Sequence, residues 1–239
     1  MHNVSVHGHN EVWKLVWKGA TKPFCSLGDG DFYTCSCTGF AYGEAGKLFL
    51  VRSQGSSEIE EFELAPLFQE AGSSGVDVGN ASLQRWEING TDIDAINTPG
   101  KLERLASDIP LREVSEVMIF SDYDHDGANT EFLLQVGVEP CGKRMMALIG
   151  VSESEPKLHA FASVDHPERP LILPSYVWEE LVGSREDASV IEWRCGDHGS
   201  ETETELIIGA ANGKIKVHST QYSCETSGKR GSLIKQENL

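Results

Sequence analysis

Short runs of alternating apolar and polar residues, separated by glycine, serine and asparagine, constrain the fold of this chain more than any other feature. In EVWKLVW, Trp13, Leu15 and Trp17 share one face, a period of two that is typical of a half-buried strand. The breaks between runs predict antiparallel hairpins rather than βαβ units, most clearly at the turn of Asn212 and Gly213. Runs of this kind occupy residues 11–17, 47–52, 58–64, 83–88, 116–120, 131–136, 144–151, 157–164, 189–195, 204–210 and 214–219.

These patterns predict an all-β protein, made mainly of antiparallel hairpins in degenerate propeller-like or sandwich sheet units. We expect one or two short helices, after Pro99 in GKLERLAS and after Pro174 in SYVWEELV. We expect residues 1–239 to form a single disulfide-stapled domain, with the loop-like stretch 67–80 as the one candidate for a boundary.

The balance of charges limits the partners of the chain. With 37 acidic and 20 basic residues, its formal net charge of −17 at pH 7 opposes binding to nucleic acid or to an anionic membrane surface. No apolar run approaches the roughly 20 residues that span a bilayer. We therefore expect a protein or glycan ligand of unknown identity, no nucleic acid and no membrane insertion.

The six cysteines lack the paired CxxC spacing of zinc sites, and their even number favours disulfides. Cys195 and Cys224 flank a predicted hairpin and are the best candidate pair, although six cysteines allow about 15 connectivities. Disulfides would place the protein outside the cell or in a periplasm. The alternative is a cytosolic protein with reduced, buried thiols.

The segment FSDYDHDGANTEFLLQVG, residues 120–137, concentrates negative charge in a turn. Asp122, Asp124 and Asp126 occupy alternate positions before Gly127, and the carbonyl of Ala128 adds a further oxygen. Carboxylates this close repel one another unless a cation lies between them. Because all these ligands are oxygen, the pattern predicts a hard cation, and Ca²⁺ suits it best.

Two other interpretations of this segment are an EF-hand and an acidic turn without an ion. An EF-hand needs a bidentate glutamate at its twelfth position, where this chain has Leu133, and helices rather than strands on either side. The EF-hand is therefore excluded. The second interpretation is an acidic turn without an ion, since aspartate and glycine are good turn formers. In either case the alternation predicts that His125 points to solvent.

The segment MIFSDYDHDGANTEFLLQVG resembles the calcium loop of FG-GAP repeats, which are also described as integrin α-chain-like or VCBS-type, over about twenty residues. In that family the last acid stands three residues after the glycine, where this chain has Thr130, and Glu131 follows. The resemblance thus implies a loop at 122–131 in which Thr130, through a water, or Glu131 completes the ligands.

A second, partial copy of this segment lies at residues 193–210. Its sequence WRCGDHGSETETELIIGA is aligned with the first so that Glu205 corresponds to Glu131, an offset of 74 residues. It keeps only Asp197 among the loop acids, so we expect no ion there.

The resemblance implies a structural ion that makes a hairpin rigid. We therefore expect a secreted or periplasmic, calcium-binding, β-rich interaction module. The alternative is an extracellular hydrolase or lyase that acts on glycans or peptides through acidic residues that a single sequence does not reveal. GxSxG, HExxH and P-loop motifs are absent. A cleft lined by two carboxylates with raised pKa values would favour the enzyme.

Overall fold

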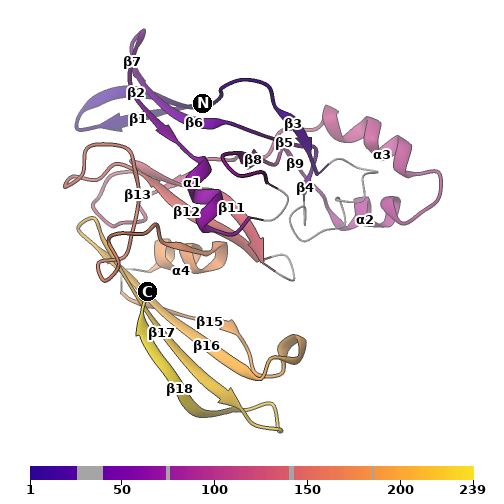
Figure 1. The fold of residues 1–239 in the computed structure, drawn as a ribbon, viewed down its shortest axis with the longest axis vertical. Helices are drawn as coiled ribbons and strands as arrows, with labels where there is room; N and C mark the ends of the chain where they lie inside the picture. The colour runs from indigo at the N-terminus through magenta and orange to yellow at the C-terminus, as the bar shows by residue number, and fades with distance from the viewer. Residues whose placement is uncertain (26–39, 74–75, 140–142, 185) are drawn as a thin grey trace. The chain divides into compact units, whose positions relative to one another are not determined.

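The computed structural model describes residues 1–25, 40–73, 76–139, 143–184 and 186–239 (Figure 1). These residues form mostly antiparallel β-sheets with four short α-helices, which confirms the all-β class. The chain divides into two compact units, residues 1–119 with 133–147 and residues 120–132 with 148–239. Residues 67–80 lie inside the first unit.

The first unit contains a four-stranded antiparallel sheet in the order β1-β2-β6-β7. The alternation in β2 buries Trp13 completely, together with Leu48 and Leu50 of β6. Arg52 is 6% exposed and pairs with Glu11 at 2.8 Å, so the charge buried in this sheet is neutralised within the chain. The strands are β1 (His2–Val6), β2 (His9–Trp17), β6 (Leu48–Gln54) and β7 (Ser57–Glu63).

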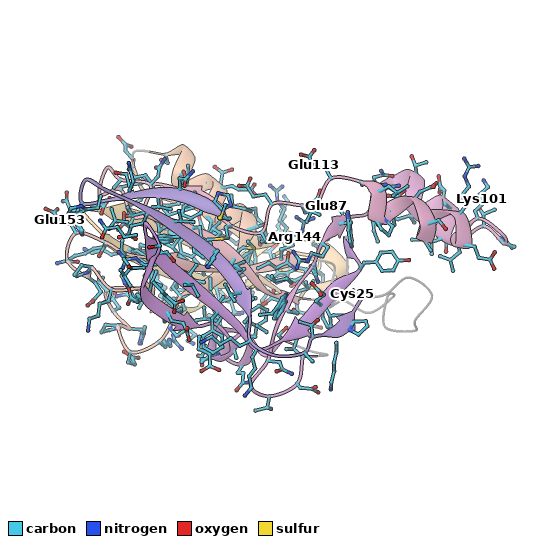
Figure 2. The ribbon with its side chains drawn as sticks, turned by 90° about the horizontal axis from the view of Figure 1, so that it is seen from above. Cys25, Glu87, Lys101, Glu113, Arg144 and Glu153 are labelled. Atoms are coloured by element: carbon cyan, nitrogen blue, oxygen red, sulfur yellow. A yellow bond between two sulfur atoms is a disulfide. The ribbon has the colours of Figure 1, made fainter. Side chains whose placement is uncertain are left out.

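Two small sheets of short strands complete the first unit. Glu87, in one of these strands, forms an ion pair with Arg144 at 3.3 Å, and both residues are labelled in Figure 2. The small sheets have the orders β3-β5-β8 and β4-β9. Their strands are β3 (Lys22–Phe24), β5 (Gly43–Gly46), β8 (Ala81–Leu83), β4 (Phe40–Ala41) and β9 (Trp86–Glu87).

Three of the helices belong to the first unit: α1 (Ala65–Glu70), α2 (Gly90–Ile96) and α3 (Leu102–Asp108), which a 3₁₀ turn at Ile109–Leu111 follows. The helix expected after Pro99 is α3. Helices α1 and α2 were not predicted. In α2, Asn89 and Asp92 form a capping box, in which each side chain accepts a hydrogen bond from the other residue's backbone N–H.

The candidate loop is flanked by two neighbouring strands of a further sheet, which has the order β10-β11-β12-β13 with β14 paired to β12. The strands on either side of the loop, which correspond to the predicted runs 116–120 and 131–136, are therefore paired neighbours in one sheet. The first of them, β10, begins at Ile119 rather than at residue 116. The strands are β10 (Ile119–Ser121), β11 (Glu131–Glu139), β12 (Lys143–Gly150), β13 (His159–Ala160) and β14 (Ile172–Pro174).

The second unit also holds a four-stranded antiparallel sheet in the order β15-β16-β17-β18 (Figure 1). Its strands are β15 (Ala188–Trp193), β16 (Thr202–Ala211), β17 (Lys214–Cys224) and β18 (Arg230–Asn238), with a 3₁₀ turn at Asp197–Gly199. Asn212 and Gly213, with φ of 51° and 76°, form the predicted turn between β16 and β17.

The helix expected after Pro174 is α4 (Ser175–Gly183). Trp178 and Leu181 are completely buried, as their spacing on one helix face predicts. No helix within the described part of the chain has the length and apolar character needed to cross a bilayer.

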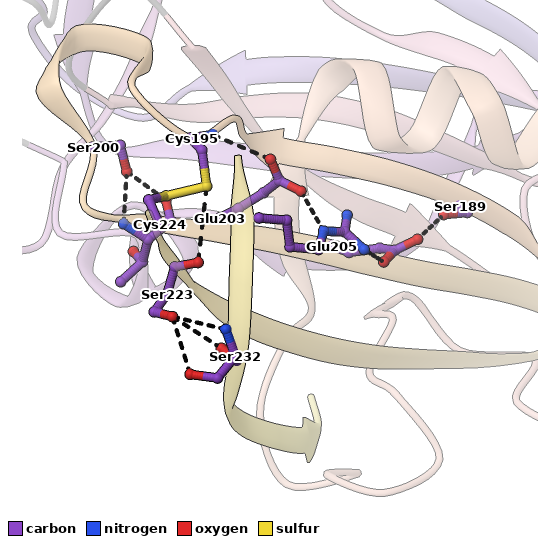
Figure 3. Close-up of polar contacts among 10 residues, drawn as sticks. Ser189, Cys195, Ser200, Glu203, Glu205, Ser223, Cys224 and Ser232 are labelled. Atoms are coloured by element: carbon purple, nitrogen blue, oxygen red, sulfur yellow. Dashed lines mark hydrogen bonds and ion pairs between the residues drawn. A yellow bond between two sulfur atoms is a disulfide. The ribbon is translucent and has the colours of Figure 1, made fainter. Parts of the chain in front are cut away.

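A disulfide joins Cys195 and Cys224, the pair that the sequence singles out (Figure 3). Their Cα atoms lie 5.4 Å apart, within the usual range for a disulfide. Cys25 is also disulfide-bonded. Cys35, Cys37 and Cys141 lie outside the described residues. Disulfide bonding is compatible with an extracellular or periplasmic location.

We predict that the double substitution Cys195→Ser and Cys224→Ser lowers the free energy of unfolding by about 3 to 4 kcal/mol. The reason is that the bond closes a loop of 29 residues and so restricts the unfolded chain. Urea denaturation under non-oxidising conditions, with the oxidised wild type as reference, measures the difference. Alkylation of both thiols in unreduced, denatured wild type would contradict the bond.

Candidate metal centre

Three carboxylates of the second unit meet at one point. One oxygen from each of Asp122, Asp124 and Glu131 lies within 4.8 Å of the others. The two aspartates follow β10 and the glutamate begins β11, so residues at both ends of the loop form the cluster.

Hydrogen bonds from the backbone fix the loop aspartates. The amide of Asp126 donates to Oδ1 of Asp124 at 3.2 Å, and the amide of Gly127 donates to Oδ2 of Asp122 at 3.2 Å. Each of these two aspartates therefore uses one oxygen to hold the turn. Gly127 has a φ of 91°, a conformation that costs a residue with a side chain about 1 to 2 kcal/mol.

Glu131 is the residue around which the loop closes. Its Oε1 accepts hydrogen bonds from the amides of Tyr123 at 2.5 Å and Asp124 at 3.3 Å. Its Oε2 accepts one from the amide of Thr130 at 3.0 Å. Gly150 lies against Glu131, and a Cβ at that position would come within 2.6 Å of the Cα of Glu131. The close pairing at Glu131 therefore requires glycine at position 150.

An aromatic side chain anchors the loop in the core of the second unit. Tyr123 is 4% exposed and packs edge-to-face on Trp178 of α4, with ring centroids 6.1 Å apart. Burial, followed by the charges of Glu131 and Glu179, raises the pKa of Tyr123 to about 12. The phenol is therefore neutral over the physiological range, and the residue acts as a hydrophobic anchor.

The turn between β16 and β17 also holds the loop. The amides of Gly213 and Asn212 donate to the carbonyl oxygens of Asp124 and His125 at 3.0 and 3.3 Å. Nδ1 of His125 lies 3.2 Å from the carbonyl oxygen of Ala210, which can only accept a hydrogen bond. The prediction that His125 faces solvent is therefore wrong. Its φ of 54° breaks the alternation on which that prediction depended.

The cluster lacks compensation for its negative charge. Asp124 and Glu131 are completely buried, and Oδ1 of Asp122 and Oδ2 of Asp124 have no hydrogen-bond partner. None of the ion pairs formed by the described residues includes any of these three side chains. A buried carboxylate oxygen without a partner is costly unless a cation or proton compensates it.

The environment changes the protonation of two members of the cluster. Burial, with the charge of Asp126 second, raises the pKa of Asp124 to about 6. Burial, with the charge of Asp124 second, raises the pKa of Glu131 to about 8. Without a cation the cluster therefore takes up protons at neutral pH. A divalent cation would compensate the charge instead.

The other predicted ligands occupy different positions. Oδ1 of Asp126 accepts a hydrogen bond from the amide of Ala128 at 2.8 Å, and Asp126 lies outside the cluster of three. The hydroxyl of Thr130 donates to the carbonyl oxygen of Val151 at 2.9 Å. Of the two alternatives for the last acid, Glu131 is the residue that joins Asp122 and Asp124.

The cluster fits a metal ion by its chemistry. Its donors are all carboxylate oxygens, and two of them are buried without hydrogen-bond partners. The identity of a metal does not follow from this geometry. The contact with the turn at residues 210–213 was not predicted, because a single sequence carries no signal for a contact 85 residues away.

Comparison of the chain with family models, with curated proteins and with solved structures finds no match.

We predict that Gly213→Ala weakens any metal-dependent gain in melting temperature more than Gly228→Ala. Both glycines have positive φ, 76° and 74°, so both substitutions carry the same backbone strain. Only at position 213 would the new Cβ lie 3.3 Å from Oδ2 of Asp124, whereas at position 228 it meets nothing within 4 Å. Melting curves with calcium and with EDTA compare the two. Equal responses would show that Gly213 does not shape the cluster.

We also predict that metal-free protein loses stability as the pH rises from 5 to 8. Folding raises the pKa values of Asp124 and Glu131 to about 6 and about 8. The stability that these two protonated groups give the folded state is therefore fully present below about pH 4 and is lost as the pH rises through this range. Each group accounts for at most about 1.4 kcal/mol per pH unit. Urea denaturation in EDTA measures the slope, and Glu131→Gln, which cannot ionise, should flatten it. An unchanged slope in Glu131→Gln would contradict the assignment.

Proposed function

We propose that this protein is a calcium-binding, β-rich interaction module of the extracellular space or a periplasm. In this proposal the ion binds Asp122, Asp124 and Glu131 and holds the loop 122–131. The observation that carries the proposal is the completely buried Oδ2 of Asp124, which has no hydrogen-bond partner and lies beside a second buried carboxylate. A cation supplies the missing partner for one oxygen of each aspartate and compensates the charge of all three side chains.

Calcium suits these donors better than other biological metals. The cluster offers only oxygen, whereas zinc and copper sites in proteins use histidine and cysteine. Ca²⁺ accepts six to eight oxygen ligands in flexible geometry, so backbone carbonyls and water can complete its shell. Mg²⁺ requires near-octahedral geometry and retains several waters. The resemblance of the strand, loop and strand at 118–137 to an FG-GAP calcium loop supports the same ion.

The burial of the cluster favours a structural role over a catalytic one. Asp124 and Glu131 are a pair of carboxyls with raised pKa values, a feature that active sites share. Both are 0% exposed, however, so a glycan or peptide would not reach them. In the first unit, Glu44 lines a cleft with Tyr42 and Trp86, but Arg85 at 2.7 Å lowers the pKa of Glu44. A lone ionised carboxylate does not supply the acid and base pair of a glycosidase.

Charge guides the proposal for the partner. A formal net charge of −17 favours cationic proteins or neutral glycans as ligands. A bound divalent cation would reduce the negative charge only locally. The module therefore keeps its overall preference for partners that are not anionic.

We expect Ca²⁺ to raise the melting temperature of the wild type relative to EDTA. A ligand at 100 times its dissociation constant adds about 2.7 kcal/mol to the stability of the folded state. Asp124→Ala should abolish the rise, because it removes the buried oxygen, and Asp124→Asn should retain part of it through its remaining oxygen. Differential scanning calorimetry gives the shifts, and isothermal titration calorimetry gives the stoichiometry.

The control for this experiment is Asp165→Ala, which removes an exposed aspartate of the same unit. It should leave the calcium response unchanged. Identical melting curves in calcium and EDTA for the wild type would reject the ion and leave 122–131 as an acidic turn.

A further inference from the structure

The hairpin that carries the metal cluster and the hairpin that carries the disulfide share one hydrogen-bonding pattern. In the first, the amide of Tyr123 donates to the carboxylate of Glu131, eight residues later. In the second, the amide of Cys195 donates at 3.1 Å to the carboxylate of Glu203, also eight residues later. Glu203 follows Glu131 by 72 residues (203 − 131). The alignment with Glu205, at an offset of 74, is therefore corrected.

The strand pairing repeats at the same offset. Val151 donates its amide to the carbonyl of Thr130, and the residues 72 positions later, Ser223 and Thr202, are direct partners in the pairing of β16 with β17. Gly150 lies against Glu131, and its counterpart Tyr222 is the partner of Glu203. A single shift of one residue in either hairpin would destroy these correspondences.

The strands that precede the two loops correspond as well. The bounds of β15 (Ala188–Trp193) map onto residues 116–121, which include all of β10. The shared pattern is a strand, a tight loop that a glutamate closes, and a hairpin. It extends over residues 188–224 and over the described residues of 116–152, which are 116–139 and 143–152.

The two copies differ in what compensates the negative charge of the glutamate that closes the loop. Nε of Arg230 lies 2.6 Å from Oε1 of Glu203, and its Nη1 lies 2.9 Å from Oε2 of Glu205. The guanidinium also stacks over the ring of Tyr222, 4.3 Å from the centroid. The amide of Cys195 and then Arg230 lower the pKa of Glu203, whereas the pKa of Glu131 is raised.

The loop residues also differ between the two copies. The counterpart of Asp122 is Arg194, whose charge also lowers the pKa of Glu203, and the counterpart of Asp124 is Gly196. The second loop thus has a base and a glycine at the positions where the first loop has two acids. The disulfide between Cys195 and Cys224 closes this copy next to Glu203 (Figure 3).

We propose that residues 116–152 and 188–224 are two copies of one structural unit with a cation position beside the glutamate that closes each loop. The guanidinium of Arg230 occupies this position in the second copy, and a divalent metal ion occupies it in the first. The part that concerns the first copy rests on the proposed function. The second copy therefore keeps its loop closed without metal.

The test places a base beside Glu131 in the first copy. Asp122→Arg puts a guanidinium at the loop position of Arg194, whose charge adds to that of Arg230 beside Glu203 in the second copy. It should raise the melting temperature in EDTA above that of the wild type in EDTA by several degrees, and it should abolish the calcium response. Asp122→Ala should abolish the response without reaching the same melting temperature. Asp165→Arg makes the same change of charge at an exposed site and should not give this rise.

The outcomes separate the two proposals. A wild type without any calcium response rejects the proposed function, whereas the comparison of Asp122→Arg with wild type in EDTA still tests the shared cation position. An Asp122→Arg melting temperature at or below that of Asp122→Ala overturns the further inference.

Arg230→Gln tests the second copy in case Asp122→Arg does not fold. It should lower the melting temperature equally in calcium and EDTA, and adding Glu203→Gln should recover most of the loss, because the buried carboxylate that Arg230 compensates is then absent. A loss that differs between calcium and EDTA, or no recovery, contradicts the role of Arg230.

Discussion

The burial of the Glu131 carboxylate at the first residue of β11 is the interaction on which the local structure depends. The carboxylate accepts hydrogen bonds from the backbone amides of Tyr123, Asp124 and Thr130. The chain before β11 must therefore curl back over the start of that strand. That curl brings Asp122 and Asp124 to the same point. The cluster is therefore a consequence of how the loop satisfies its backbone amides, which need partners when they are buried.

Several glutamates of this protein are buried, and the group that compensates their negative charge differs from one site to the next. Glu11 is 5% exposed and pairs with Arg52, which lowers its pKa although burial opposes this. Glu203 pairs with Arg230. Glu131 is buried more completely than either, yet it has two aspartates beside it. Because removing a charge from water costs several kcal/mol, this difference is the main physical argument for an ion.

Much of the fold could be predicted from local sequence patterns. Period-two alternation located the strands around Trp13 and Leu134, and the helix signals after Pro99 and Pro174 gave α3 and α4. Helix α1 has no side-chain cap, and the local signal at its start is a proline in the first turn, Pro66. In α2 the capping box of Asn89 and Asp92 was present in the sequence but was not recognised, because Asn-Gly is also a common turn signal.

The candidate site could be predicted only in part, for a similar reason. Asp122 and Asp124 belong to a local pattern, but the choice between Thr130 and Glu131 depends on which side chain turns inward at the start of β11. That orientation is set by the hydrogen bonds to the Glu131 carboxylate and by the absence of a side chain at Gly150. The contacts from residues 210–213 depend on the tertiary fold of the second unit, which no local pattern specifies.

These contacts give the proposed ion an effect beyond its own loop. The carbonyl oxygens of Asp124 and His125 accept hydrogen bonds from the backbone amides of the turn between β16 and β17. Two residues after that turn, the carbonyl oxygen of Ile215 accepts a hydrogen bond from the amide of Val164. An ion that fixes Asp124 therefore also fixes the end of the second hairpin within the same unit. At the opposite end of that hairpin, the disulfide of Cys195 and Cys224 and the cation of Arg230 hold the chain without metal. In this proposal, a metal ion stabilises one end of the hairpin of β16 and β17, whereas covalent and ionic bonds within the chain stabilise the other end.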